Sequence, residues 1–411
     1  MMTQTPKSEC PTFALVGRVN AGKSTLLNFI AGQDVAIVSP VPGTTTDVVE
    51  KAMELRPFGR IVFLDTAGID DESALWQERR LATKRAVERA DVVVVVNPDD
   101  ATEAFLADVK KPRIMVGRGV SSAPAGKGLP ALPFIAVDTS DLSQRDTFLE
   151  AFKNAIEKTM PGLAGVENPL DGLATSGGWI MHVVPIDSQA PKGRLILPQV
   201  MTLRAALDLN CRNIVTTEKE FAAAFADLKT PPQLVVCDSQ VVEKVMAALP
   251  EEIPCTTYSI LMARSKGGLA ELAAGAAAID TLRDNDRVLV AEVCTHHAGG
   301  DDIGRVKIPN LLKRKTGKTL AFDFVSGRYF ADDAKRYALV VHCGGCMATR
   351  GQMAARIAQA KTAGVPITNY GVCIAHCQGV LTRALKPFME CGGLPPLSIR
   401  NEKAASSRRT P

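Results

Sequence analysis

A glycine-rich segment near the N-terminus carries the residue types that bind phosphate groups. Between an apolar run at 13–16 and a segment of helical composition at 23–31, the sequence is Gly17-Arg18-Val19-Asn20-Ala21-Gly22-Lys23-Ser24. It fits the pattern G-x-x-x-x-G-K-[ST], and a strand before it and a helix after it distinguish a phosphate-binding loop from a chance turn. Backbone N–H groups would hold the phosphates, Lys23 would neutralise their charge, and the Ser24 hydroxyl would ligate Mg²⁺. The predicted nucleotide-binding set is residues 17 to 24 together with Thr25.

Two later segments complete the site that a GTPase needs. The first, Leu64-Asp65-Thr66-Ala67-Gly68, contains D-x-x-G after a strand. Asp65 would hold Mg²⁺ through water, and the Gly68 N–H would meet the γ-phosphate. The second, residues 42–47, resembles a switch loop, in which Thr44 and Thr45 join the nucleotide site and Thr45 completes the Mg²⁺ shell. No catalytic residue is assigned, because Ile69 stands where a Ras-type enzyme carries its water-orienting Gln.

Asn20 gives a hint about the class of GTPase. GTPases of the translation and tRNA-modification type carry an Asn inside this loop that helps to bind potassium. By that resemblance we expect a slow, K⁺-activated hydrolase of GTP, in which K⁺ replaces a missing arginine finger.

The guanine-recognising motif N-K-x-D is missing. It should follow the predicted strand at 113–116, where the sequence is instead Gly117-Arg118-Gly119-Val120. No carboxylate stands there to accept hydrogen bonds from guanine. The segment Asn97-Pro98-Asp99-Asp100 fits N-x-x-D in part, but it follows the preceding strand, lacks the Lys, and is interpreted as a strand-end turn. The sequence therefore predicts nucleotide binding and leaves the preference for guanine open.

The last third of the chain concentrates soft metal ligands. Cys294-Thr295-His296 follows a predicted strand at 288–293, and His342-Cys343-Gly344-Gly345-Cys346 follows another at 337–341. Because the carboxyl ends of parallel strands share one edge of a sheet, we expect these two loops to converge. Thiolates suit zinc or an iron–sulfur cluster. A structural zinc site would take Cys3His, whereas a cubane held by three thiolates would leave one iron open to histidine, water or an exogenous group.

Other cysteines and histidines receive simpler interpretations. Cys373 and Cys377 lie on one predicted helix with His376 between them, and both cysteines are interpreted as core residues. His182 lies in a predicted strand and is interpreted as a satisfied core histidine. Cys391, beside two glycines, is left without a role.

Strands and helices alternate along most of the chain, which predicts an α/β fold with mostly parallel sheets. We expect three domains: a P-loop GTPase domain (1–165), a second α/β domain for packing or dimerisation (173–266) and a third α/β domain with the cysteines (267–400), followed by a flexible tail (401–411). In the third domain, strands are predicted at 288–293, 337–341 and 365–368, with helices at 348–363 and 374–387.

Composition excludes several classes of protein. The 411 residues are 46% hydrophobic and 22% charged, which is ordinary for a globular chain and excludes disorder as the main state. A net charge of +4 and 5% aromatic residues do not favour nucleic-acid binding. No apolar run approaches the length of a membrane span, and no secretory signal opens the chain. We therefore expect a cytoplasmic protein with no nucleic-acid or membrane partner.

The order of these motifs resembles the HydF family of FeFe-hydrogenase maturation GTPases. The resemblance extends through nearly the whole chain. It is most specific in four strings, Ala190–Gln199, Glu292–His297, Asp302–Pro309 and His342–Met347. The missing N-K-x-D and the additional group of Cys373, His376 and Cys377 depart from the family pattern.

The resemblance implies functions that the residues alone do not show. The middle domain would form a homodimer. Cys294, Cys343 and Cys346 would bind a 4Fe-4S cluster, with His296 or His342 near the fourth iron. The open iron would help to hold a di-iron precursor bearing CO, cyanide and a dithiolate bridge. The protein would receive it from the radical-SAM maturases HydE and HydG and deliver it to the FeFe-hydrogenase catalytic subunit, while GTP hydrolysis regulates partner exchange.

Two other functions compete with this scaffold. One is an RNA-modification or ribosome-assembly GTPase with a structural zinc module, which should carry a basic, aromatic-bearing face. The other is a P-loop protein that binds nucleotide without turnover. Iron or zinc in the purified protein would separate the first from the scaffold.

Overall fold

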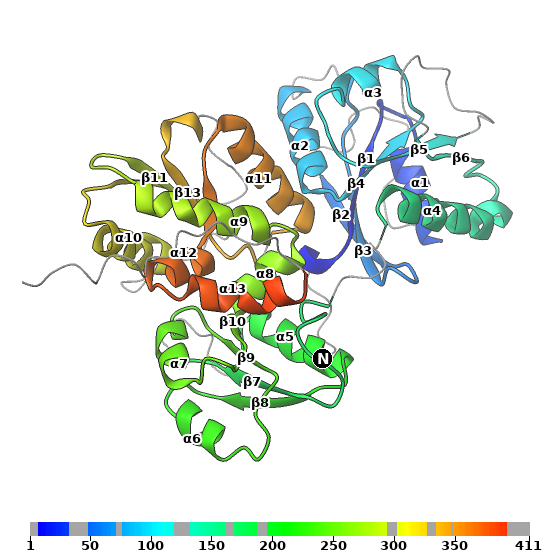
Figure 1. The fold of residues 1–411 in the computed structure, drawn as a ribbon. Helices are drawn as coiled ribbons and strands as arrows, with labels where there is room; N and C mark the ends of the chain where they lie inside the picture. Colours follow the sequence, from blue (N-terminus) through cyan, green and yellow to red (C-terminus); the bar gives the residue numbers. More distant parts are fainter. Residues whose placement is uncertain are drawn as a thin grey trace, which may run out of the picture. The chain divides into compact units, whose positions relative to one another are not determined.

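The computed structural model describes residues 7–32, 48–70, 76–118, 132–161, 168–186, 195–293, 302–326, 334–346 and 348–392. The chain divides into two compact units, the first made of residues 1–167 with 348–355 and the second of 168–347 with 356–411. Each unit is an α/β structure with mostly parallel sheets, as the alternation of strands and helices predicts (Figure 1).

A six-stranded sheet forms the centre of the first unit. Its strands are parallel except for the β2–β3 pair. The order is β2 (Val49–Glu54), β3 (Arg60–Asp65), β1 (Thr12–Val16), β4 (Val92–Val96), β5 (Arg113–Arg118) and β6 (Phe134–Val137). The helices are α1 (Lys23–Ala31), α2 (Trp76–Arg89), α3 (Asp100–Phe105) and α4 (Arg145–Thr159).

Strand β4 shows why this sheet is buried on both faces. Its sequence is five consecutive valines, and all five are fully buried. Val92, Val94 and Val96 belong to one apolar core, and Val93 and Val95 belong to another. Alternate residues of a strand point to opposite faces, so a continuous apolar run requires cover on both sides.

Two four-stranded parallel sheets form the second unit. One has the order β10 (Cys255–Thr257), β9 (Leu234–Cys237), β7 (Trp179–Val183) and β8 (Arg212–Thr216). Its helices are α5 (Leu197–Asp208), α6 (Phe221–Ala226), α7 (Val242–Ala248) and α8 (Tyr258–Ser265).

The other sheet has the order β12 (Ala321–Ser326), β11 (Arg287–Glu292), β13 (Leu339–His342) and β14 (Ile367–Asn369). Its helices are α9 (Leu269–Ala276), α10 (Ile308–Thr316), α11 (Arg350–Ala363), α12 (Tyr370–Cys377) and α13 (Leu381–Glu390), with a π-helical turn at Ile303–Lys307. Strand β12 lies at the edge of the sheet and is absent from the sequence prediction.

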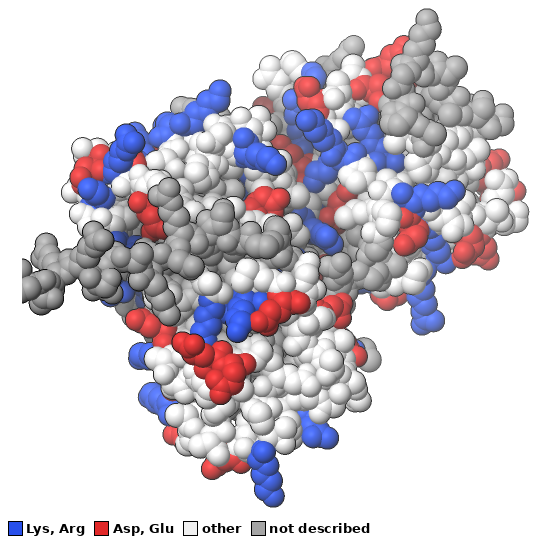
Figure 2. Space-filling view, viewed as in Figure 1, with Lys and Arg blue, Asp and Glu red and all other residues white. Residues whose placement is uncertain are grey.

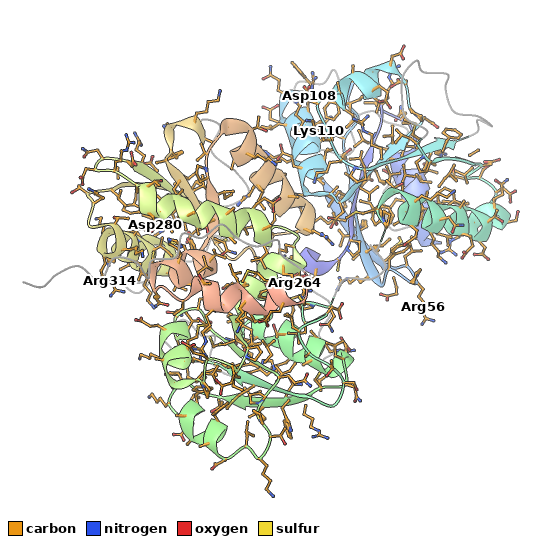
Figure 3. The ribbon with its side chains drawn as sticks, viewed as in Figure 1. Arg56, Asp108, Lys110, Arg264, Asp280 and Arg314 are labelled. Atoms are coloured by element: carbon orange, nitrogen blue, oxygen red, sulfur yellow. The ribbon has the colours of Figure 1, made fainter. Side chains whose placement is uncertain are left out.

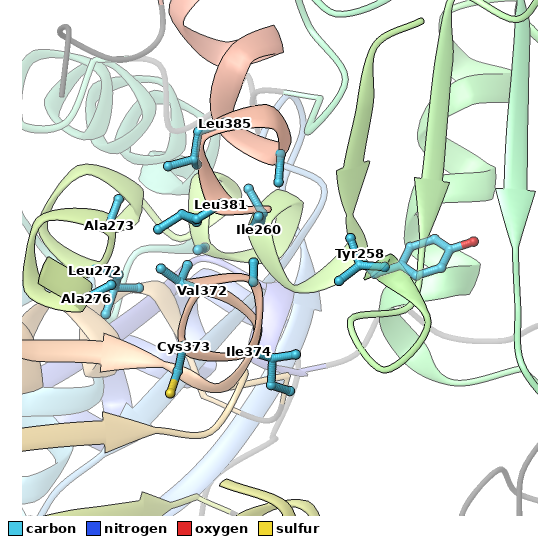
Figure 4. Packing of buried hydrophobic residues seen from close by; sticks show 14 of the residues in the cluster. Tyr258, Ile260, Leu272, Ala273, Ala276, Val372, Cys373, Ile374, Leu381 and Leu385 are labelled. Atoms are coloured by element: carbon cyan, nitrogen blue, oxygen red, sulfur yellow. The ribbon is translucent and has the colours of Figure 1, made fainter. Parts of the chain in front are cut away.

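One apolar core joins the two sheets of the second unit. It includes Tyr258 and Ile260 of α8, Leu272 of α9, Val372 of α12 and Leu381 of α13. Figure 4 shows Ile260, Leu272, Val372 and Leu381 grouped between helices from both parts of the unit, and Tyr258 apart from them beside the strands of the other sheet. The two sheets are therefore held by shared apolar packing.

Charged residues of both signs are interspersed over the face of each unit that Figure 2 displays. Within the described ranges, no helix has the length and apolar character needed to cross a membrane.

Candidate functional site

The phosphate-binding loop lies between the end of β1 at Val16 and the start of α1 at Lys23. Two of its residues, Asn20 and Gly22, have positive φ angles of 60° and 87°. The end of the Arg118 side chain packs directly on Gly22, where an added Cβ would lie 1.4 Å from Nη1. Left-handed residues in such a turn direct successive backbone N–H groups inward, which creates an anion-binding concavity at the helix N-terminus.

Lys23 is buried beneath this loop. Its Nζ donates to the carbonyl oxygens of Gly17, at 3.0 Å, and Arg18, at 2.7 Å. Burial lowers the pKa of Lys23 to about 8, although Asp65 and Asp70 partly offset that effect. An incoming phosphate would offer this cation a stronger, charged acceptor than the two carbonyl groups.

Ser24 and Asp65 meet as the magnesium prediction requires. The Ser24 hydroxyl donates to Asp65 Oδ2 at 2.7 Å. The other carboxylate oxygen, Asp65 Oδ1, is buried and has no hydrogen-bond partner among the described residues. Burial raises the pKa of Asp65, against the hydrogen bond from Ser24 and the charge of Lys23. A buried carboxylate oxygen beside a hydroxyl fits the hard oxygen ligands that Mg²⁺ selects.

The segment containing D-x-x-G packs against the phosphate loop. A Cβ at Gly68 would lie 2.5 Å from the Val19 backbone nitrogen, so only glycine permits this approach. Asp70, which the sequence analysis missed, fixes the contact by accepting from Val19 N at 2.6 Å and Arg18 Nε at 2.7 Å. These bonds outweigh partial burial and lower the pKa of Asp70. The only feature of the sequence that points to Asp70 is its position two residues after Gly68.

The segment after β4 is a turn, as predicted. Asp99 caps α3 by accepting from Thr102 N at 2.9 Å. Asn97 has a positive φ of 51°, donates to Ala21 O at 3.1 Å, and accepts from Arg118 N at 2.6 Å. This segment therefore supports the phosphate loop and the end of β5.

The convergence of the two cysteine-bearing strand ends is confirmed. Strands β11 and β13 are parallel neighbours, with Ala291 paired to His342. At that edge, Val293 N donates to Cys343 Sγ at 3.4 Å. Cys294 directly follows Val293, and His296 comes two residues later. Both lie outside the described residues, as do Thr44 and Thr45. Cys346 is described and partly exposed, like Cys343.

Two features of this edge fit a soft metal centre. Burial raises the pKa of Cys343, while N–H groups of Val293 and Gly345 donate to its sulfur and favour the thiolate. A positively charged metal would complete that stabilisation. Gly345 has a φ of 67°, which turns the chain between Cys343 and Cys346.

His342 does not offer a nitrogen to this centre in the structure. Its ring is fully buried, with Nδ1 at 2.7 Å from Cys343 O and Nε2 hydrogen-bonded to Arg356 Nη1. Because Arg can only donate, Nε2 must be the acceptor and Nδ1 must carry the proton. Burial and the Arg356 charge lower the pKa of His342 to about 3. Both nitrogens of His342 are thus used in supporting the Cys343 loop.

A polar group that the sequence analysis did not assign lies at the same edge. Glu292 ends β11, is buried, and accepts from Tyr370 Oη at 3.0 Å and from Ser326 Oγ at 3.3 Å. A Cβ at Gly304 would lie 2.0 Å from Tyr370 Oη, so the π-helical turn needs glycine there. This contact gives a physical reason for the glycine in the string Asp302–Pro309.

The remaining cysteines and histidines are mostly structural. Cys373 is fully buried in the apolar core, as predicted, and Figure 4 shows it beside Val372 and Ile374. Cys377 is partly buried, and a hydrogen bond from Cys373 lowers its pKa. His376 Nε2 lies 3.0 Å from Asp280 Oδ2, on the part of the second unit where Figure 3 labels Asp280. Within the described ranges, no three His, Cys, Asp or Glu residues are placed to hold a metal ion.

His182 is the satisfied core histidine that the sequence predicted. It is fully buried, with Nε2 at 2.8 Å from Asn213 Oδ1 and Nδ1 at 3.3 Å from Tyr258 Oη. Burial lowers its pKa to about 4, so the ring is neutral at physiological pH.

Two curated relatives each match less than a third of the chain. A GTPase Der from Thermomicrobium roseum is 46% identical over 25% of this chain and 22% of its own length. A tRNA modification GTPase MnmE from Roseobacter denitrificans is 41% identical over 29% of each chain. Among solved structures, an Era from Aquifex aeolicus is 19% identical, with a TM-score of 0.31 over 51% of this chain and 94% of its own. The chain thus spans under a third of the length of these curated relatives, whose activities are not transferred to it.

Family models extend over most of the chain. The model of the 50S ribosome-binding GTPase matches residues 12–117, which contain the phosphate loop, Asp65 and Gly68. The model of the Hydrogen maturase F dimerization domain matches residues 170–267, and that of the Hydrogen maturase F tetramerization domain matches residues 270–387. The last two models together cover more than half of the chain and follow a GTPase domain, so this chain belongs to the HydF family of hydrogenase maturation GTPases.

Proposed function

We propose that this chain is a GTP-hydrolysing scaffold that carries the di-iron precursor of the FeFe-hydrogenase cofactor. Cys294, Cys343 and Cys346 bind a 4Fe-4S cluster, and His296 lies near its fourth iron. The observation that carries the proposal is the pairing of β11 with β13, which brings Cys343 to the N–H group of Val293, directly before Cys294. Two loops far apart in sequence thereby supply soft ligands at one edge of a sheet in a chain that also holds a phosphate loop.

The protein's own part at the cluster is to hold charge and limit ligation. When bound, the cluster supplies an iron with an exchangeable position. Backbone N–H groups of Val293 and Gly345 stabilise thiolate charge at Cys343, and the bonds of His342 to Cys343 O and Arg356 fix the loop. Because His342 is occupied in this way, the di-iron cargo has one fewer protein ligand to displace.

In the GTPase domain, Lys23 neutralises the outer phosphates, while Ser24 and Asp65 hold Mg²⁺ with Thr45. Asn20 is exposed on the loop and is proposed to bind K⁺ beside the phosphates. Single-turnover hydrolysis in 100 mM KCl and in 100 mM NaCl tests the ion, with about tenfold faster turnover expected in potassium because a fixed cation replaces an arginine finger. Equal rates in the two salts would remove K⁺ from the proposal.

The dimer is proposed to form through the domain at 173–266. Strand β8 is the outer strand of that sheet and pairs only with β7 among the described strands, and its Val215 is 50% exposed. An exposed strand edge is a template for pairing with a second copy. HydE, HydG and the hydrogenase catalytic subunit are the proposed exchange partners, and GTP hydrolysis regulates their exchange.

Anaerobic purification followed by iron and zinc analysis and low-temperature EPR of the reduced protein tests the scaffold. A 4Fe-4S signal with about four irons per chain is the expected result. Stoichiometric zinc, with no cluster even after reconstitution with iron and sulfide, would contradict it and favour a GTPase with a structural zinc module.

A further inference from the structure

An arginine occupies the end of β5, where the guanine-recognising motif is missing. Arg118 Nε and Nη2 both donate to Thr139 Oγ1, at 2.8 Å and 2.6 Å. Its Nη1 lies 3.4 Å from Ala21 O, in the phosphate loop. The backbone N–H of Arg118 donates to Asn97 Oδ1. The guanidinium is thus held from the phosphate loop and from the segment after β6, while the backbone of Arg118 is held from the end of β4.

These contacts leave one edge of the guanidinium available. A guanidinium carries five N–H donors, and three are directed at Thr139 and Ala21. Nε and Nη2 share the lateral edge, which faces Thr139. The two remaining N–H groups, one on Nη1 and one on Nη2, form the end-on fork. Within the described residues this fork has no acceptor.

The chemistry of the fork selects one kind of base. Arginine donors match the adjacent O6 and N7 acceptors of guanine, whereas adenine presents an N6 amino donor beside N7. Asp138, the carboxylate close in sequence to Thr139, is exposed, and its Oδ1 accepts from both N and Oγ of Ser140, which turns that oxygen toward its own loop. The donor set at this edge therefore favours a base recognised by its acceptors.

We propose that Arg118 recognises a 6-oxopurine nucleotide by donating its end-on fork to O6 and N7. This mode replaces the carboxylate that accepts from N1–H and the 2-amino group in GTPases with N-K-x-D. The inference rests on the proposed nucleotide binding and defines its substrate class. A carboxylate-based site penalises the loss of the 2-amino group, and an Arg-based site does not, because neither O6 nor N7 changes between guanine and hypoxanthine.

Competition binding with the full chain tests this assignment, using GTP, ITP, ATP and inorganic tripolyphosphate against a fluorescent GDP analogue with Mg²⁺. We expect GTP and ITP to bind within about threefold of one another and ATP to bind roughly tenfold or more weakly. Equal affinity for ATP and GTP would overturn the proposal, and so would an ITP affinity more than tenfold below that of GTP. Failure of every compound, tripolyphosphate included, would instead reject the nucleotide site itself.

Variants connect the selectivity to the side chain. Arg118→Met should bring the GTP and ATP affinities to within about threefold, whereas Arg118→Lys, which keeps the charge but loses the planar fork, should retain part of the difference. Thr139→Val should reduce the GTP preference, because Thr139 positions the guanidinium. Arg56→Met is the matched control, since Arg56 is exposed and labelled in Figure 3 away from the phosphate loop. An unchanged GTP-to-ATP ratio in Arg118→Met would contradict the role of Arg118.

Discussion

The phosphate loop and the cysteine-bearing edge occupy equivalent positions in two different sheets. Each lies at the carboxyl ends of parallel strands, where ligands bind in open α/β sheets. The loop of the first unit is enclosed by its own hydrogen bonds, such as Lys23 to Gly17 and Ser24 to Asp65. The edge of the second unit presents the Cys343 thiol, whose sulfur accepts from backbone N–H groups. The same arrangement of parallel strands therefore presents oxygen ligands at the phosphate loop and sulfur ligands at the cysteine-bearing edge.

The two sites also differ in how the chain assembles them. The described residues of the phosphate site come from positions 17–70, and β1 pairs directly with β3 to bring Ser24 near Asp65. The cysteine edge needs β11 and β13, which are neighbours in the sheet but are separated along the sequence by α10 and β12. The phosphate site can be predicted from the offsets within its motifs, whereas predicting the cysteine edge also requires the assumption that parallel strand ends share one edge of a sheet, which the β11–β13 pairing confirms.

The largest expected effect is the loss of iron when a cysteine ligand is replaced, and it distinguishes cysteines that bind the cluster from cysteines that pack in the core. Cys343→Ser should reduce bound iron from about four per chain to less than one, because a hydroxyl is a poor replacement for a soft thiolate. Iron analysis and EPR after anaerobic reconstitution measure the change. Cys211→Ser is the control, since Cys211 is buried beside the other sheet of this unit. A cluster retained at full occupancy in Cys343→Ser would remove Cys343 from the ligand set.

Loss of the buried cation tests the phosphate site. Lys23→Ala should weaken GTP binding by roughly a hundredfold, about 3 kcal/mol, because a charged hydrogen-bond donor to phosphate is lost. Titration calorimetry measures the affinity, with Lys110→Ala as a control at an exposed position. Iron content should be the same in both variants. A GTP affinity within threefold of the parent protein would show that the loop binds phosphate through its backbone alone.

Gly275 and Gly344, both near the sheet that contains β11 and β13, differ in how closely other atoms pack against them. Gly275 of α9 packs so closely on β14 that an added Cβ would lie 2.0 Å from Ile367 O, whereas a Cβ at Gly344 would meet nothing within 4 Å. Gly275→Ala should therefore destabilise the second unit by about 1–3 kcal/mol. Gly344→Ala should change the free energy of unfolding by less than about 0.5 kcal/mol. Chemical denaturation of the apo-protein measures both, and a reversed order would contradict this account of α9 packing.

The smallest effect is a pH dependence confined to the phosphate site. The pKa of Lys23 is lowered by burial to about 8, below its usual value of 10.5, and bound phosphate would raise it again. Below pH 8 the amine is already protonated, so affinity should be flat. Above pH 8, binding must take up a proton, and GTP affinity should fall by up to about tenfold per pH unit. Calorimetry at pH 7 and pH 9 in two buffers measures the proton uptake, and no uptake at pH 9 would contradict the lowered pKa.

Sequence reasoning identified the main strands of each sheet because their apolar runs are long and are bounded by turns. It missed β12, because the six residues Ala-Phe-Asp-Phe-Val-Ser are exposed or half-buried at the edge of the sheet and include polar residues that break the apolar run. It predicted one helix at 374–387 where the structure has two, α12 and α13, because Gly379, with a φ of 74°, interrupts the helix between them.

At the candidate site, the phosphate-loop motif predicts Lys23 and Ser24, and D-x-x-G predicts Asp65 and Gly68, because each residue has a defined place within its own motif. Asp70 and Glu292 were missed because a lone carboxylate has no pattern until its hydrogen-bond partners are known. His342 was treated as a possible ligand because sequence position cannot tell which ring nitrogen is already occupied.

The apolar core shared by the two sheets of the second unit has a consequence for how that unit folds. Helix α8 and helices α12 and α13 contribute to one buried cluster, although the matched family models meet at residues 267–270. A fragment ending near residue 267 would expose apolar faces that α12 and α13 cover in the full chain. The two matched segments should thus unfold together, giving one calorimetric transition for the unit, and neither should fold well when expressed without the other.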